Sequence, residues 1–197
     1  MELTPAFLLQ MMRATLLDPK AGAAAVLRLG FAPIVGWMAL LLMAVASTLL
    51  THISFAMMPP EAQEFWGAAM GSPIRTAIFQ WVMLLLSVHA IHKIGRWRGG
   101  NGSLEGAVLL VAWLQFILLC LQVVQLLAQA VAAPMADMLS LFGLALFLWL
   151  LTNFTAVLHG FQSRMLVFLG ILLTVFTASL VLAIVFTLAV GVPVGGV

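Results

Sequence analysis

Four long stretches of the chain contain no charged residue. They lie between Arg28 and Glu61, between Glu105 and Asp137, between Asp137 and Arg164, and after Arg164. Each window is longer than the roughly 20 residues that a helix needs to cross the hydrocarbon core of a bilayer. A fifth apolar run, over about 73–94, is shorter. The pattern predicts an all-α membrane bundle with five spans, over about 32–56, 73–94, 104–129, 136–159 and 164–190.

The segment before the first span, residues 1–31, has a different character from the five-helix domain expected over 32–197. Thr4 can cap a first helix with Pro5 in its first turn, and Asp18-Pro19 ends that helix before a second short one. Apolar residues share one face with basic residues nearby, which is typical of helices that lie in the membrane interface. Docking onto a partner is the alternative.

Composition supports membrane insertion, because 64% of the residues are hydrophobic and only 7% are charged. Soluble domains carry about 25% charged residues, so a soluble globular enzyme is excluded. The few basic residues gather on one side of the expected topology: three in the leader, three after the second span and one after the fourth. They are Arg13, Lys20, Arg28, Lys93, Arg96, Arg98 and Arg164. The positive-inside rule then predicts a cytoplasmic N-terminus and a C-terminus outside, and makes these residues candidates for head-group or partner contacts.

The turn after the second span is the most polar part of the chain, and it reads HKIGRWRGGNGSLEG from His92 to Gly106. It lacks the strand-to-helix context and the Gly-Lys-Ser/Thr ending of a phosphate-binding loop. Its glycines permit a tight reversal, and Ser103 can cap the third span with Glu105 near the positive helix end.

The third span carries four glutamines: Gln115, Gln122, Gln125 and Gln129. At 100° per residue they share one face, which we expect to point into the bundle together with Asn153 of the fourth span. Hydrogen bonding between helices is the favoured interpretation. A wet pathway or ligand site along this face is the alternative.

Three histidines lie at similar depth near one end of the spans: His89, His92 and His159. A pair such as His89 and His159 has the side chains to hold a haem or a metal. No attachment motif or acidic neighbour accompanies them, so we expect hydrogen bonds to helix ends and head groups and no cofactor. The sequence shows no nucleophile elbow or zinc motif, and we expect no enzymatic activity.

Several short motifs occur in an order that resembles the bacterial branch of the Yip family, the Ypt/Rab-interacting membrane proteins. They are Asp18-Pro19, Gly99-Gly100-Asn101-Gly102-Ser103, Ala112-Trp113, and His159-Gly160-Phe161 followed by Arg164. The resemblance covers almost the whole chain. It implies five spans, a cytoplasmic N-terminus and no catalytic residues. Eukaryotic members are linked to small GTPases through a longer N-terminal region. This chain has only about thirty residues before the first span, so we do not extend that activity to it.

The leading hypothesis is a non-enzymatic, multi-pass protein of the bacterial inner membrane. It would act as a scaffold, membrane-organising factor or accessory subunit. Its expected partners are the lipid bilayer, other membrane proteins or further copies of itself, and no nucleic acid. A small oligomeric transporter or channel that uses the glutamine face is the first alternative. A haem- or quinone-linked membrane subunit is the second.

Overall fold

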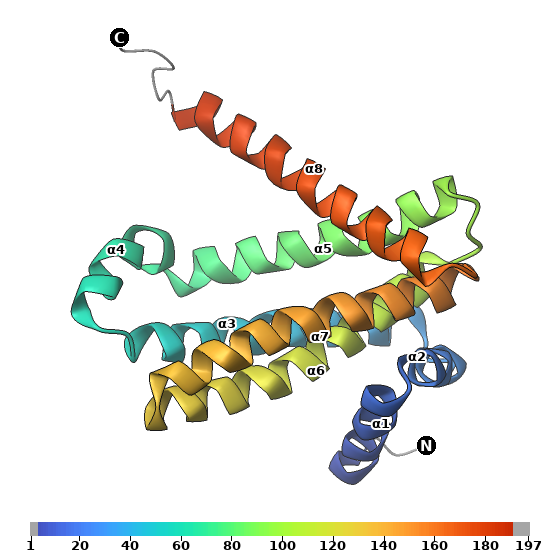
Figure 1. Cartoon of the computed structure of the whole chain (residues 1–197), viewed down its shortest axis with the longest axis horizontal. Helices are drawn as coiled ribbons and strands as arrows, with labels where there is room; N and C mark the ends of the chain where they lie inside the picture. Colours follow the sequence, from blue (N-terminus) through green and yellow to red (C-terminus); the bar gives the residue numbers. More distant parts are fainter. Residues whose placement is uncertain (1–3, 191–197) are drawn as a thin grey trace.

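The structure, a computed structural model, describes residues 4–190, which form helices joined by short turns (Figure 1). In order they are α1 (Pro5–Leu17), α2 (Pro19–Arg28), α3 (Pro33–Ala56), α4 (Pro60–Met70), α5 (Pro73–Trp97), α6 (Leu104–Val131), α7 (Ala133–His159) and α8 (Arg164–Val190). Five of them, α3, α5, α6, α7 and α8, are long and apolar enough to cross a membrane. The all-α, five-span prediction is therefore confirmed. The second span, α5, runs to Trp97, three residues beyond the predicted end at 94.

Prolines and small polar side chains set where these helices begin. A proline occupies the first turn of α1 to α5 and of α7, where its missing N–H has no intrahelical partner to lose. Asp18 accepts hydrogen bonds from the N–H groups of Lys20 and Ala21, both at 3.0 Å. Ser103 accepts one from Gly106 N–H at 3.0 Å, and Thr4 caps α1, both as predicted.

Helix α6 is the centre of the bundle and packs against α3, α5 and α7. Its first half is almost entirely buried, from Gly106 to Leu114. One core cluster joins α6 to α3 and α5 through Leu40, Val88 and Val108. A second joins α6 to α7 and α2 through Trp113 and Leu150. The glycine turn between α5 and α6 and the turn between α7 and α8 lie at one end of the bundle, which we name the loop end (Figure 1).

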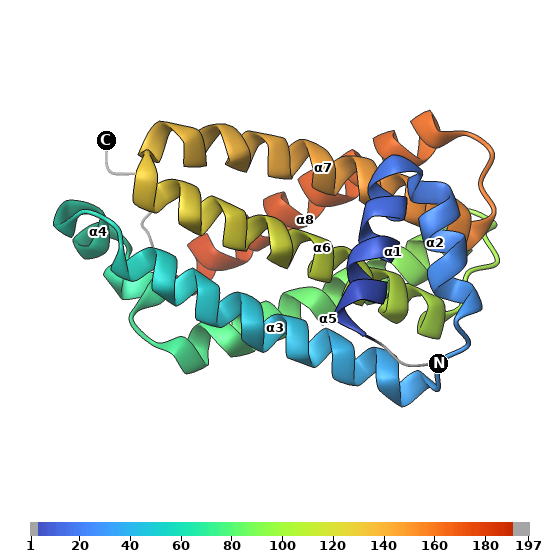
Figure 2. The same cartoon turned by 90° about the horizontal axis from the view of Figure 1, so that it is seen from below.

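Helices α1 and α2 cross the bundle near this loop end (Figure 2). Ala23 and Val26 of α2 are buried against Trp113 of α6 and Leu150 of α7. The indole Nε1–H of Trp113 donates a hydrogen bond to Thr15 Oγ1 at 3.2 Å. The apolar face of the leader, expected at the membrane interface or on a partner, therefore packs on the chain's own bundle. The first three residues of the predicted 1–31 unit lie outside the described residues.

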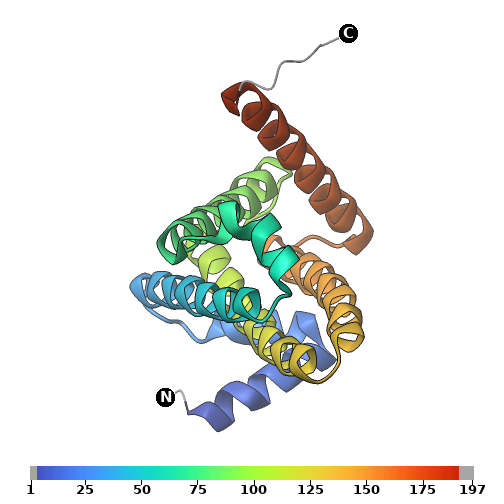
Figure 3. The same cartoon turned by 90° about the vertical axis from the view of Figure 1, so that its left-hand side faces the viewer.

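Helix α8 contacts α7 near its start and then projects away from the other spans (Figure 3). Only 6% of the apolar window Arg164–Val181 is buried, against 44% for α6 and for α7. Its large side chains, such as Leu173 and Phe176, are therefore exposed. Residues 191–197, at the end of the expected five-helix domain, lie outside the described residues.

Candidate functional site

The glycine turn is closed by hydrogen bonds that end α5. Gly99 has a positive φ of 87°, a conformation that glycine adopts without steric cost. Gly100 N–H donates to Gly95 O at 2.9 Å and Gly99 N–H donates to Arg96 O at 3.0 Å. Together these bonds form a Schellman motif, which satisfies the last carbonyl groups of the helix.

Helix α7 ends nearby in the same way. Gly160 has a φ of 73°, and Phe161 N–H donates to Ala156 O at 2.9 Å. The two helix ends are joined because Asn101 N–H, in the glycine turn, donates to His159 O at 3.3 Å. Helices α5 and α7 thus meet at the loop end.

The imidazole of His159 fills the space between these ends, and the residue is only 2% exposed. Its Nδ1 lies 3.2 Å from the Gly102 N–H, which can only donate, so Nδ1 must accept. Its Nε2 lies 3.1 Å from Ile91 O and therefore carries the proton. The hydrogen-bond partners thus assign the neutral Nε2–H tautomer. Phe161 stacks on the ring, with 5.5 Å between the ring centroids.

Glycines surround this ring because no larger residue leaves room for it. A Cβ atom at Gly100 would lie 2.5 Å from His159 Cβ, and one at Gly102 would lie 2.7 Å from Cε1. A Cβ atom at Gly95 would overlap Nε2. We name His159 with Gly95, Gly100 and Gly102 the histidine cradle. From the sequence we predicted only that these glycines allow the chain to reverse. Their spacing gave no indication of the imidazole that they enclose.

The other candidate histidines lie apart from this arrangement. His89 is exposed, and its Nδ1 lies 2.8 Å from Leu85 O of its own helix. The structure does not join His89 and His159 as a ligand pair, and both ring nitrogens of His159 have backbone partners. His92 is half-buried and within electrostatic range of His159, and its Nδ1 has no hydrogen-bond partner among the described residues. Within residues 4–190 no cluster of three or more potential metal ligands is found.

A line of side-chain hydrogen bonds joins α6 to α3 and α5. Gln122 Oε1 accepts from Ser47 Oγ at 3.3 Å, and Gln122 Nε2 donates to Thr51 Oγ1 at 3.2 Å. Gln80 Nε2 donates to the same Ser47 Oγ at 2.7 Å. Farther from the loop end, Ser54 Oγ donates to Gln129 Oε1 at 3.0 Å. We name these six residues the polar seam. Its amides and hydroxyls satisfy one another, which is the arrangement expected of contacts between membrane helices.

The remaining predicted polar residues lie elsewhere. Gln125 Nε2 donates to Leu139 O of α7 at 3.1 Å, so it faces a different neighbour from Gln122 and Gln129. Asn153 is 3% exposed and donates to Trp149 O of its own helix at 2.8 Å. Gln115 is half-buried. We did not predict Ser47, Thr51 and Ser54 of the seam from the sequence, although their spacing of four and three residues places them on one helix face.

The seven basic residues named from the sequence are all exposed and lie on α1 and α2, at the end of α5 and at the start of α8. They are Arg13, Lys20, Arg28, Lys93, Arg96, Arg98 and Arg164. Trp97 lies among them and is 82% exposed. Basic residues flanked by an exposed indole are typical of the head-group layer of a membrane.

Five long apolar helices, with polar side chains bonded between helices and seven of the eight basic residues toward one end, define a multi-pass helical membrane protein. Comparison with protein families makes this more specific. The chain matches the Yip1 domain over residues 13–186, and it belongs to the Yip1 domain family. No curated protein and no solved structure gives a significant match.

We predict that Gly95→Ala lowers the free energy of unfolding by about 1–3 kcal/mol, because the new methyl group overlaps the His159 ring. In a His159→Ala background the same substitution should stabilise the protein instead, since alanine is the better helix former. Chemical unfolding in detergent of the single and double variants measures both effects. Gly170→Ala is the matched control, because nothing lies within 4 Å of its added Cβ. An equal loss from Gly95→Ala in both backgrounds would refute the cradle.

We predict that Ser47→Ala and Gln122→Leu are energetically coupled by about 0.6 kcal/mol, the average for hydrogen bonds between membrane helices. A double-mutant cycle measured by unfolding tests this coupling. Pairing Gln122→Leu with Ser140→Ala gives the control, since Ser140 Oγ donates to Ala136 O of its own helix. A coupling no larger than that of the control pair would show that the seam does not join α3 to α6.

Proposed function

We propose that this Yip1 domain protein is a non-enzymatic scaffold, membrane-organising factor or accessory subunit that acts through helix and lipid contacts. We place it in the bacterial inner membrane with its N-terminus in the cytoplasm. The basic residues at the loop end support this orientation through the positive-inside rule. The observation that carries the proposed activity is the exposure of α8, of whose apolar window only 6% is buried.

An apolar helix with one shallow contact offers nearly its whole circumference to lipid or to another helix. Lipid tails are as apolar as leucine, so association between membrane helices depends on close packing at small residues. Gly170 of α8 is such a residue, because a Cβ atom added to it would have no other atom within 4 Å. We therefore place a contact with another membrane protein, or with a second copy of this chain, on the side of α8 that contains Gly170.

The polar groups favour this role over the two alternatives. The glutamines of a transport pathway should face water or solute, whereas Gln122 and Gln129 bond to hydroxyl groups of α3. A haem ligand needs a free imidazole nitrogen, whereas both nitrogens of His159 bond to backbone groups.

We predict that Gly170→Leu removes the partner while leaving the fold intact, because a Cβ atom at this position meets no other atom within 4 Å and the longer side chain blocks close approach of a second helix. The full chain is extracted from native membranes in polymer nanodiscs, and proteins that copurify are quantified by mass spectrometry. Wild type should retain a stoichiometric partner or a second copy, and Gly170→Leu should lose it at an unchanged unfolding temperature. Leu169→Ile, the conservative change at the adjacent exposed position, is the control and should retain it.

Two results would contradict the proposal. One is a wild-type protein that is recovered alone. The other is a solute flux in proteoliposomes that Gln122→Leu abolishes, since this would make the seam a pathway.

A further inference from the structure

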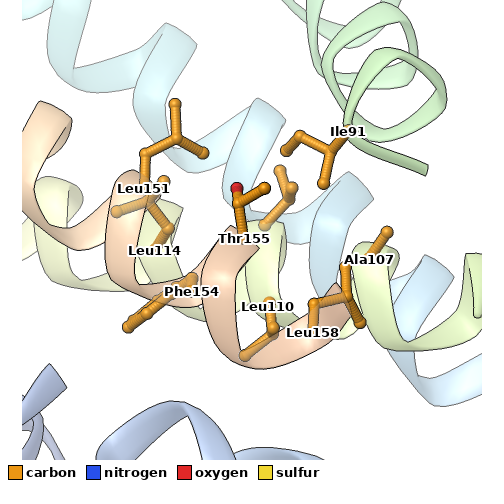
Figure 4. A pocket seen from close by; sticks show the side chains of 9 residues that line it. Ile91, Ala107, Leu110, Leu114, Leu151, Phe154, Thr155 and Leu158 are labelled. Carbon is orange, nitrogen blue, oxygen red and sulfur yellow. The ribbon is translucent and has the colours of Figure 1, made fainter. Parts of the chain in front are cut away.

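Two cavities near the loop end differ greatly in size. The smaller lies between α5, α6 and α7 and has a volume of about 10 Å³. Thr155 lines it, and its buried Oγ1 has no hydrogen-bond partner among the described residues (Figure 4). One water molecule fills a cavity of this size, so it cannot hold a larger ligand. The larger cavity has a volume of about 400 Å³, which is within the range of small-molecule sites.

The larger cavity lies between the linker from α2 to α3 and the start of α6, and we name it the linker cavity. Leu27 and Phe31 line it on the side of the linker, and Leu109 lines it on α6. The linker and the glycine turn both lie at the loop end (Figure 2). A Cβ atom at Gly106 would lie 2.8 Å from Leu158 Cδ1 and 3.2 Å from Leu27 Cδ2. Helices α2, α6 and α7 therefore meet closely at one wall of the cavity.

Three polar side chains also line the linker cavity, and they belong to Asn101, Ser103 and Glu105. All three residues are exposed, whereas Gly102 between the first two is buried and bonds to His159. The side chains supply an amide oxygen, a hydroxyl and a carboxylate, each of which can accept a hydrogen bond. None of the described residues that line the cavity is basic. The cavity is therefore an acceptor-rich site with one negative charge, at an end of the molecule where basic residues otherwise prevail.

This chemistry selects the kind of ligand. A primary ammonium has a positive charge and three N–H donors, so it can bond to all three acceptors. A quaternary ammonium has the same charge and no N–H donor. The apolar walls beside the acceptors indicate that the cation belongs to an amphiphile. Because basic residues and the exposed Trp97 place the loop end in the head-group layer, a membrane lipid is the amphiphile that reaches this cavity.

We propose that the linker cavity binds the head group of an ethanolamine phospholipid. The ammonium donates hydrogen bonds to the Glu105 carboxylate, to Asn101 Oδ1 and to Ser103 Oγ. The glycerol backbone lies against the apolar wall that includes Phe31 and Leu109, and the acyl chains remain in the bilayer. This inference rests on the lipid contact in the proposed function and names its chemistry.

The test uses the full chain in nanodiscs that contain equal amounts of phosphatidylethanolamine, phosphatidylcholine and phosphatidylglycerol with the same acyl chains. Native mass spectrometry counts the lipids retained on release. Wild type should retain phosphatidylethanolamine in preference to phosphatidylcholine. Glu105→Gln should lower that preference about fivefold, because the charge-assisted hydrogen bond is replaced by a neutral one. Glu64→Gln makes the same change at an exposed residue of α4, at the opposite end of the bundle, and should leave the preference unchanged (Figure 1).

Two results would overturn the proposal. One is equal retention of phosphatidylethanolamine and phosphatidylcholine by wild type. The other is an equal effect of Glu105→Gln and Glu64→Gln.

Charge reversal gives a gain of binding that loss of folding cannot imitate. Glu105→Lys should change the preferred lipid from phosphatidylethanolamine to the anionic phosphatidylglycerol, because the cavity then presents a positive charge. An unchanged lipid preference at an unchanged unfolding temperature would contradict a head group bound at Glu105.

A competition experiment separates a lipid from a soluble amine. Phosphoethanolamine, the head group without hydrocarbon, should not displace phosphatidylethanolamine from wild type at millimolar concentration. Displacement would assign the cavity to a soluble amine, and the lipid assignment would be wrong. Copurification through α8 is measured separately, so a failed lipid site and a failed scaffold role give different results.

Discussion

The His159 ring is the contact on which the loop end depends. A buried imidazole has two nitrogens that need partners, and in a membrane bundle those partners must come from the protein. Here Gly102 N–H and Ile91 O supply them, from the glycine turn and from α5. The ring reaches both because Gly95, Gly100 and Gly102 have no Cβ atom. One side chain thereby ties the end of α7 to the end of α5 and to the turn that leads into α6.

The histidine cradle and the polar seam act at different depths of the same bundle. The cradle joins α5 and α7 at the loop end, and the seam joins α3, α5 and α6 farther along. Hydrophobic burial gives little specificity between helices in lipid, since lipid is equally apolar. Directional hydrogen bonds and close packing therefore determine which helices are neighbours.

Charge and hydropathy were enough to predict the spans, because the cost of placing charge in a bilayer is large and local. Helix caps at Thr4 and Ser103 were predictable for a similar reason, since each depends on residues within one turn. Side-chain partners were not predictable. Periodicity placed Gln122 and Gln125 on one face, but it contains no information on which helix covers each part of that face. The docking of α2 and the enclosure of His159 likewise depend on residues far apart in sequence.

The protonation pattern of the His159 ring is the most direct test of this account. Imidazole ¹⁵N chemical shifts of the full chain in lipid bilayers distinguish a nitrogen that carries a proton from one that accepts a hydrogen bond. At neutral pH we predict an accepting Nδ1 coupled through a hydrogen bond to the Gly102 amide, and a protonated Nε2. A protonated Nδ1, or a ring that averages between tautomers as in water, would contradict a histidine held between two backbone groups.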